Sequence, residues 1–420
     1  MENPGLEHHD DLRDGRAPWR AGGRPRRLSL EQDRRCDVLV VGAGITGALV
    51  AETLSARGLD VAVVDRERPG LGSTAASTAM LLWEIDKPLG ELTALYGFER
   101  AAALYRRSLR AVSGLARLVR ALDVSCALRP RRSLYLAAGE TGEAALQAEH
   151  ALRRRAGLPG AFVDYRDLRR DFGFDREAAL LSPGSFDADP LCLAHGLLDV
   201  VIARGVSVYD ADAVAFDGGG RTAFVGLEDG RVIEADRVVL ATGYVMPDIV
   251  RSDLHRIAST WAIATPPQSE GERWRDGLLL WEASETYLYA RTTVDDRLIV
   301  GGEDDEEAVT PEKRAAVTPE KTSALLRKLE SLFPQARAVA ELSWAGAFGI
   351  TEDGLPLIGA VPGHPRFLAA YGYGGNGITF AYMASRLIAA TIAGRRLAWA
   401  DDVAIDRPVP PSVGEVSLAA

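Results

Sequence analysis

The chain has 420 residues, of which 47% are hydrophobic and 26% are charged, and its net charge is -10 at pH 7. This length is more than one hydrophobic core usually serves, so we expect a globular protein with two domains. The acidic balance argues against a nucleic-acid-binding surface, which requires concentrated Lys and Arg.

The first 35 residues are polar and carry both charges, without the apolar centre of a signal peptide. We expect an extended arm held in place by Trp19, with the adjacent His8 and His9 solvated rather than bound to a metal. No apolar run in the chain reaches the roughly 18 to 20 residues that span a bilayer. The cysteines are widely separated and form no CxxC pair, which predicts a reducing, cytoplasmic environment and no metal site. They are Cys36, Cys126 and Cys192.

The stretch VLVVGAGITGALVAETLSARGLDVAVVDRE, residues 38–67, predicts a βαβ unit. An apolar strand leads into Gly42, Gly44 and Gly47, a helix follows, and a second apolar strand ends at Asp65. The first glycine allows a tight turn, the second a close approach of the backbone to a pyrophosphate, and the third close packing of the helix. A carboxylate about 20 residues further on can accept hydrogen bonds from a ribose 2′-OH. The unit therefore predicts a dinucleotide site, for FAD or NAD rather than NADP.

Beyond this unit the pattern alternates between helical and extended segments. We expect helices over 91–122 and 140–156. The segments 206–214 and 231–244 are typical of strands that return to the first sheet, and 285–301 predicts an antiparallel hairpin.

The last third of the chain contains two further signals. VTPEKRAAVTPEK, which starts at Val309, predicts two helix starts, each with Pro in its first turn. A strand over 367–370 leads through the glycine-rich turn 371–377 into a long helix from about Ile378. A helix N-terminus opened by glycines is a second place for an anion or a polarised ring atom.

The first glycine motif, GSTAAST, VLATG, WAGAFGITEDGLPLIG and GYGGNGIT occur in this order between residues 37 and 394. In this order they resemble the D-amino-acid oxidase-like family of FAD-dependent oxidoreductases, which includes glycine, sarcosine and γ-glutamylputrescine oxidases. The resemblance implies an α/β fold with a Rossmann-type FAD-binding domain and a second, substrate domain built on an antiparallel sheet (α+β). The FAD-binding domain would comprise 36–90, 157–250 and 340–400, and the substrate domain 91–156 and 251–339. The N-terminal arm would cover 1–35 and the C-terminal tail 401–420.

The resemblance also implies noncovalent FAD, with the first glycine motif at its pyrophosphate. Positions that contact the adenosine, phosphate and ribityl groups in the family are matched here by Asp65, Arg66, Ser73, Thr74, Val214, Thr242 and Gly243. The second glycine turn would present backbone N–H groups to the flavin ring, where the helix dipole stabilises negative charge on the reduced ring. Its residues are Gly374, Gly375, Asn376, Gly377 and Ile378.

Departures from the family concern the substrate. Phe348 takes the place of the arginine that grips the substrate carboxylate in the glycine oxidase branch, and Ala79 and Thr379 take the places of the clamp in the sarcosine oxidase branch. An apolar side chain cannot compensate the desolvation of a carboxylate. Either the substrate is an amine with no nearby carboxylate, or another cation grips it. Arg291 is the candidate for that cation, and a surface pair with Asp295 is its alternative role.

The chemistry implied is hydride transfer from a C–H next to nitrogen to flavin N5. Orientation and a dry pocket can suffice for this step, so no dedicated acid or base is required. We expect the substrate to contact Arg291, Tyr373, Tyr289 and Phe348. An aromatic cage for a cationic or neutral amine is expected from Trp281, Tyr287, Tyr289 and Tyr373.

The electron acceptor is oxygen or another oxidant. Ile299 takes the place of the oxygen-activating lysine of the sarcosine oxidase branch, so a dehydrogenase is the principal alternative to an oxidase. A non-catalytic FAD-binding protein is a further alternative, and a plain NAD-binding protein a third.

Overall fold

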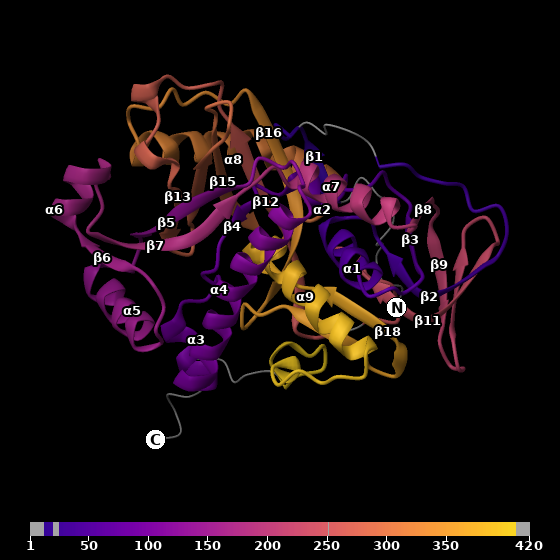
Figure 1. Ribbon diagram of the computed structural model, residues 1–420. Coiled ribbons are helices and arrows are strands. Elements are labelled where there is room, and N and C mark those ends of the chain that lie inside the picture. Colours follow the sequence, from indigo (N-terminus) through magenta and orange to yellow (C-terminus); the bar gives the residue numbers. More distant parts are fainter. Residues whose placement is uncertain (1–11, 20–24, 251, 409–420) are drawn as a thin grey trace.

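The computed structural model describes residues 12–19, 25–250 and 252–408, and the strands of these residues form two sheets that lie side by side (Figure 1). His8 and His9 lie outside the described residues, so their predicted role is not addressed by the structure.

The first sheet has the parallel centre expected of a dinucleotide-binding domain. Its order is β17-β18-β11-β2-β3-β8, with the β9–β10 hairpin joined to β11. Strands β18, β11, β2, β3 and β8 are parallel, and β17 runs antiparallel to β18. The strands are β2 (Arg34–Val41), β3 (Val61–Asp65), β8 (Ser207–Asp210), β9 (Ala213–Asp217), β10 (Ala223–Leu227), β11 (Val232–Leu240), β17 (Leu357–Val361) and β18 (His364–Tyr371).

Both faces of this sheet are buried, which explains why its strands read as continuous apolar runs. In β2, Val38 and Val40 pack on one face against the helices α1 (Ile45–Ser55), α7 (Pro190–Ala203) and α9 (Gly377–Ile392). Leu39 and Val41 pack on the opposite face in a second core. The predicted βαβ unit and the two returning strands are confirmed.

The second sheet is almost wholly antiparallel. Its order is β1-β16-β12-β15-β14-β13-β5-β7-β4, with β6 paired to β7, and the β13–β5 pair alone among its described pairs is parallel. The predicted hairpin is confirmed as β14 paired with β15. The strands are β1 (Arg13–Gly15), β4 (Met80–Leu81), β5 (Arg129–Ala137), β6 (Ala161–Asp164), β7 (Ala178–Asp187), β12 (His255–Ala264), β13 (Leu279–Ala283), β14 (Leu288–Thr292), β15 (Leu298–Asp305) and β16 (Leu342–Thr351).

Helices cover the second sheet and join it to the first. The long helix α8 (Pro311–Leu332) packs Leu325, Leu329 and Leu332 on the second sheet, and α4 (Phe98–Ala121) packs against α9, which covers the first sheet. The predicted helices over 91–122 and 140–156 are confirmed as α3, α4 and α5. The remaining α-helices are α2 (Ser73–Ala76), α3 (Leu89–Tyr96), α4 (Phe98–Ala121), α5 (Glu143–Arg155), α6 (Tyr165–Asp167) and α8 (Pro311–Leu332).

The two predicted helix starts near Val309 are wrong, because α8 is one helix that contains Pro319. Pro311 occupies its first turn after the capping Thr310, as expected. Pro319 has no N–H to donate within the helix, but two side-chain hydroxyls near it bond to helix carbonyls. The Thr318 hydroxyl donates to the Arg314 carbonyl at 2.7 Å, and the Ser323 hydroxyl donates to the Pro319 carbonyl at 2.8 Å. Packing of the C-terminal half of α8 on the sheet holds the helix together across the proline.

Sheet membership departs from the predicted domain boundaries. The boundary at 157 puts β6 and β7 in the FAD-binding domain, and the boundary at 340 does the same for β16, but all three strands pair in the second sheet. The described part of the arm behaves as expected, since β1 pairs with β16 and the Trp19 indole N–H donates to the Ser77 carbonyl at 2.9 Å. No helix among the described residues combines the length and apolar character needed to cross a membrane.

Candidate active site

The first glycine turn joins β2 to α1 and requires glycine at two positions. Gly42 has φ +105°, and a Cβ there would overlap the Ala241 carbonyl. A Cβ on Gly47 would overlap the Gly42 carbonyl, so α1 could not approach the turn. The N–H groups in the first turn of α1 have no acceptor within their own helix, and they open beside Gly44. This is the arrangement that binds phosphates at helix N-termini.

Asp65 lies at the carboxyl end of β3, next to this turn. Its Oδ2 accepts from the Ala43 N–H at 2.6 Å and its Oδ1 from the Glu67 N–H at 2.8 Å. Burial raises the pKa of the Asp65 carboxyl to about 6, and these two hydrogen bonds oppose the shift. At neutral pH it is a carboxylate with lone pairs left to accept from a ribose.

A cavity of about 1390 Å³ runs from Asp65 to the second sheet. It brings together every predicted site residue except Gly47, which packs below the turn, and Arg291. One end is lined by Gly42, Gly44, Asp65, Arg66, Ser73, Thr74, Val214, Thr242 and Gly243. The other end is lined by Tyr289, Phe348, Tyr373, Gly374, Gly375, Asn376, Gly377 and Ile378.

These residues fit an FAD molecule. The hydroxyl of Ser73 is buried at the wall of the cavity and has no hydrogen-bond partner among the described residues, as expected of a group that binds a ligand. The hydroxyl of Thr74 accepts from the Ile45 N–H at 3.0 Å and so ties the GSTAAST loop to the start of α1.

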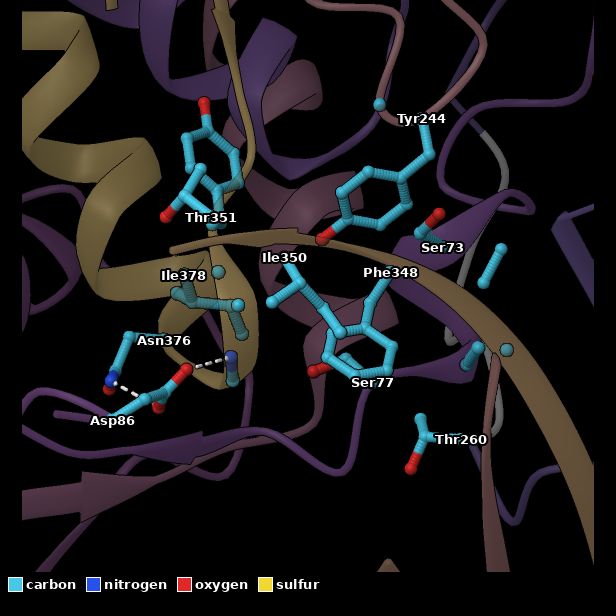
Figure 2. Close-up of a pocket in the computed structure, with 18 of the residues that line it drawn as sticks. Ser73, Ser77, Asp86, Tyr244, Thr260, Phe348, Ile350, Thr351, Asn376 and Ile378 are labelled. Carbon is cyan, nitrogen blue, oxygen red and sulfur yellow. Dashed lines mark hydrogen bonds between the residues drawn. The ribbon is translucent and has the colours of Figure 1, made fainter. Parts of the chain in front are cut away.

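The second glycine turn is held by an acidic residue that the sequence analysis did not single out. Asp86 accepts from the Gly375 N–H at 2.6 Å and from the Asn376 side-chain amide at 2.9 Å (Figure 2). Two of the predicted flavin-facing groups thus already donate to protein. The first-turn N–H groups of α9, from Gly377 on, have no acceptor within their own helix and remain suited to an anionic ring edge.

The three aromatic residues among the predicted substrate contacts line the cavity, but one of them, Tyr373, is hydrogen-bonded to α1. Phe348 and Ile350, on the same face of β16, both lie at the cavity wall (Figure 2). Tyr289 lines the cavity with Tyr287 at a ring-centroid distance of 6.0 Å. Tyr373 is buried and its hydroxyl accepts from the Thr46 hydroxyl at 3.4 Å, which turns it toward α1.

The predicted aromatic group is therefore not one cage. Trp281 stacks on Tyr135, with ring centroids 3.9 Å apart, while Tyr287 and Tyr289 form a second pair.

Arg291 does not line the cavity, which contradicts its predicted role as the substrate-gripping cation. It is 2% exposed, and its Nη1 donates to the carbonyls of Thr78, Ala79 and Ala188 at 2.8 to 2.9 Å. Its Nη2 lies 3.5 Å from a carboxylate oxygen of Asp187, so the alternative pair with Asp295 is also wrong. Burial lowers its pKa to about 10. Arg291 supports the loop behind the cavity.

A second acidic residue missed by the sequence analysis, Asp304, lines the same end of the cavity as Asp86. Its Oδ2 accepts from the Tyr287 hydroxyl at 2.6 Å, and its Oδ1 is buried without a partner among the described residues. Asp86 and Asp304 lie on unrelated segments and belong to no motif. The one available signal was that each follows a largely apolar segment of the sequence, MLLWEI and LIVGGE. In the structure Asp304 lies within β15, and Asp86 lies in the loop after β4.

Comparison with known proteins supports the flavin assignment. The family described as FAD dependent oxidoreductase (DAO) matches residues 37–391. The γ-glutamylputrescine oxidoreductase of Escherichia coli K12 is 27% identical over 384 residues, which cover 87% of this chain and 85% of that protein. Glycine oxidase from Geobacillus kaustophilus superimposes with a TM-score of 0.71 at 20% identity, over 90% of this chain and all of that one. L-proline dehydrogenase from P. horikoshii superimposes with a TM-score of 0.69 at 18% identity, over 90% and 96% of the two chains.

Proposed function

The chain belongs to the DAO family of FAD-dependent oxidoreductases, and from this premise we propose that it oxidises the C–N bond of an amine or amino acid. The observation that carries the proposal is the single cavity that joins the dinucleotide-binding turn to a wall of aromatic and acidic side chains. FAD, when bound, supplies the hydride acceptor at N5. The substrate loses a hydride from carbon and a proton from nitrogen, and water hydrolyses the resulting imine to a carbonyl compound and an amine or ammonia.

The residues of the chain provide binding, orientation and exclusion of water. Gly42, Asp65 and Thr74 would hold the dinucleotide, and the start of α9 would face the ring. Phe348 and Ile350 make the substrate side apolar, which favours the neutral, reactive form of an amine over its ammonium form. Such a site works by holding the reacting carbon in place.

A dehydrogenase is the second candidate, and one observation favours it. Ile299, which takes the place of the oxygen-activating lysine of the sarcosine oxidase branch, is fully buried against Trp344 and does not line the cavity. No cation from this position reaches the site to stabilise reduced oxygen, so the electrons would pass to another acceptor.

The test is an anaerobic titration of the purified protein with amines and amino acids, followed by visible absorbance. Bleaching of the flavin bands by one of these compounds supports the proposal. If the bands return when air is admitted, the protein is an oxidase. If they stay bleached in air, it is a dehydrogenase. A yellow protein that no amine or amino acid bleaches would refute C–N oxidation and favour a non-catalytic flavoprotein.

A further inference from the structure

Charge is distributed unevenly at the substrate end of the cavity. Apart from Glu285 and Asp86, which are exposed, and the half-buried Asp304, the carboxylates that line this end have a cationic partner. Glu91 is paired with Lys87 at 3.3 Å, Glu149 with Arg153 at 2.7 Å, and Glu282 with Arg176 at 2.8 Å. Lys87 is the one cation at this end among the described lining residues, and Glu91 already neutralises it.

Asp86 and Asp304 have no ion pair with any described residue. Asp86 is exposed to the open cavity, but the protein around it still desolvates the carboxyl and raises its pKa to about 6. The charge of Asp304 adds to this shift, and the Gly375 N–H and the charge of Lys87 oppose it. Burial likewise raises the pKa of Asp304, although the hydroxyls of Tyr287 and Thr260 and the charge of Lys321 oppose this. Lys321 is itself paired with Asp305, at 3.2 Å.

The second observation is the buried Oδ1 of Asp304. Buried carboxylate oxygens are almost always hydrogen-bonded, and one left without a donor destabilises the protein unless a ligand supplies the donor. Neither nearby hydroxyl donates to this oxygen: the Tyr287 hydroxyl donates to Oδ2, and the Thr260 hydroxyl, although close enough to lower the pKa of Asp304, donates to the Gly302 carbonyl at 3.2 Å. We infer that the missing donor is cationic, because Asp86 and Asp304 both line this end and the two cations that act on them, Lys87 and Lys321, are already paired with Glu91 and Asp305.

Building on the proposed function, we propose that Asp86 and Asp304 bind an ammonium group of the substrate that is not the nitrogen oxidised, so the substrate is a diamine or polyamine. The two nitrogens are distinct because carboxylates stabilise a protonated amine. A protonated nitrogen has no lone pair with which to support loss of hydride from its neighbouring carbon. The reacting nitrogen lies instead against the apolar wall of Phe348 and Ile350.

The same charges disfavour a simple α-amino acid. Its carboxylate would lie beside two uncompensated carboxylates, and neither Phe348 nor Arg291, which is turned away from the cavity, offers a cation to pair with it. Tyr287 and Tyr289 add ring faces, which favour a cation over an anion.

The binding test uses three probes that share a tert-butyl group and differ in charge: tert-butylammonium, tert-butanol and the slightly larger pivalate. None has a hydrogen on the carbon next to its polar group, so none is oxidised. Each is titrated into the FAD-loaded protein, and the shift of the flavin absorbance bands is recorded. We expect tert-butylammonium to bind and the neutral and anionic probes to bind at least about 10-fold more weakly. Tighter binding of pivalate would overturn the proposal.

Variants locate the site. Asp304→Asn should weaken tert-butylammonium binding by about 10-fold or more. Asp86→Asn should do the same, and because Asp86 also holds the glycine turn, Asp304→Asn carries the test if Asp86→Asn fails to take up FAD. Asp305→Asn is the matched control, since Asp305 is the next residue on β15 and faces Lys321. Wild-type binding by Asp304→Asn, or equal loss in Asp305→Asn, would overturn the proposal.

Kinetics then separate this inference from the proposed function. We expect kcat/KM for 1,4-diaminobutane to exceed that for butylamine by at least about 10-fold in the wild-type protein, and the two values to converge in Asp304→Asn. Equal values in the wild type would overturn the diamine assignment while C–N oxidation stands. If no amine or amino acid bleaches the flavin but tert-butylammonium binds through Asp304, the proposed function fails and the ammonium site stands.

Discussion

Replacing Arg291 tests whether this buried cation supports the fold or binds substrate. In Arg291→Met the carbonyls of Thr78, Ala79 and Ala188 lose their shared donor, Nη1. Asp187 does not become an isolated charge, because Arg129 still donates to it at 2.6 and 2.9 Å and Arg131 at 3.1 Å. Ala79 adopts φ +51°, and Arg291 helps to hold it there.

The expected loss follows from the three carbonyls. Each buried acceptor left without a donor costs about 1 to 3 kcal/mol, and breaking a buried ionic network typically costs about 3 to 5 kcal/mol in total. We take about 3 to 5 kcal/mol as the loss in the free energy of unfolding, which would lower the urea midpoint by about 1 M or more. Tryptophan fluorescence of the apoprotein during urea titration measures it.

Arg297→Met is the matched control on the same hairpin. Arg297 pairs with Asp295 and Glu341, whose carboxylates are about half exposed, and donates to one backbone carbonyl, that of Thr265, at 3.0 Å. Its loss should therefore cost less than that of Arg291, about 1 to 2 kcal/mol. A substrate-gripping role predicts the opposite pattern. If Arg291→Met unfolds at the wild-type urea concentration but no longer binds anionic ligands, the structural role assigned here is wrong.

Three further outcomes are expected. Gly47→Ala should abolish FAD uptake, because the new Cβ would overlap the carbonyl of the glycine turn. Gly271→Ala, where a new Cβ meets no atom within 4 Å and φ is not positive, should retain it. FAD content after purification measures both, and normal FAD in Gly47→Ala would contradict the turn geometry. Since the raised pKa of Asp86 is about 6, tert-butylammonium affinity should rise between about pH 5 and 7 as the carboxylate forms, and should then level off; an affinity that falls over this range would exclude binding by the ionised group. Arg407→Leu should lower the free energy of unfolding by about 3 to 5 kcal/mol at pH 7, because Asp353 loses its buried partner. Burial alone would raise the pKa of Asp353, but Arg407 holds it below its usual value, so the stabilisation is present above the usual pKa and is lost as pH falls through the lowered one. A variant as stable as the wild type at pH 7 would show that the pair contributes nothing.

The cofactor half of the site was predictable because its determinants are local. The βαβ unit places strand β2, the turn at Gly42, helix α1 and Asp65 within about 30 residues, as is usual for such a unit. Each part is marked in the sequence, either by glycines that the turn requires or by the spacing of apolar residues. The glycine turn before α9 was found for the same reason. Pro319 shows the limit of local rules, since packing of later leucines on the second sheet keeps a helix intact where the sequence alone predicts a new start.

The substrate half was decided by tertiary structure. Successive residues of a strand point to opposite faces of the sheet, so the sequence does not say which face Arg291 occupies. Only the packed fold determined that its guanidinium reaches the loop carbonyls behind the cavity rather than the cavity itself. Asp86 and Asp304 are 218 positions apart in the chain, and neither belongs to a motif. The sequence by itself determined a dinucleotide-binding flavoprotein fold, because backbone sterics act between neighbours. The charge of the substrate end emerged only in three dimensions, because electrostatic pairing depends on distance in space and on which carboxylates the fold leaves without a cation.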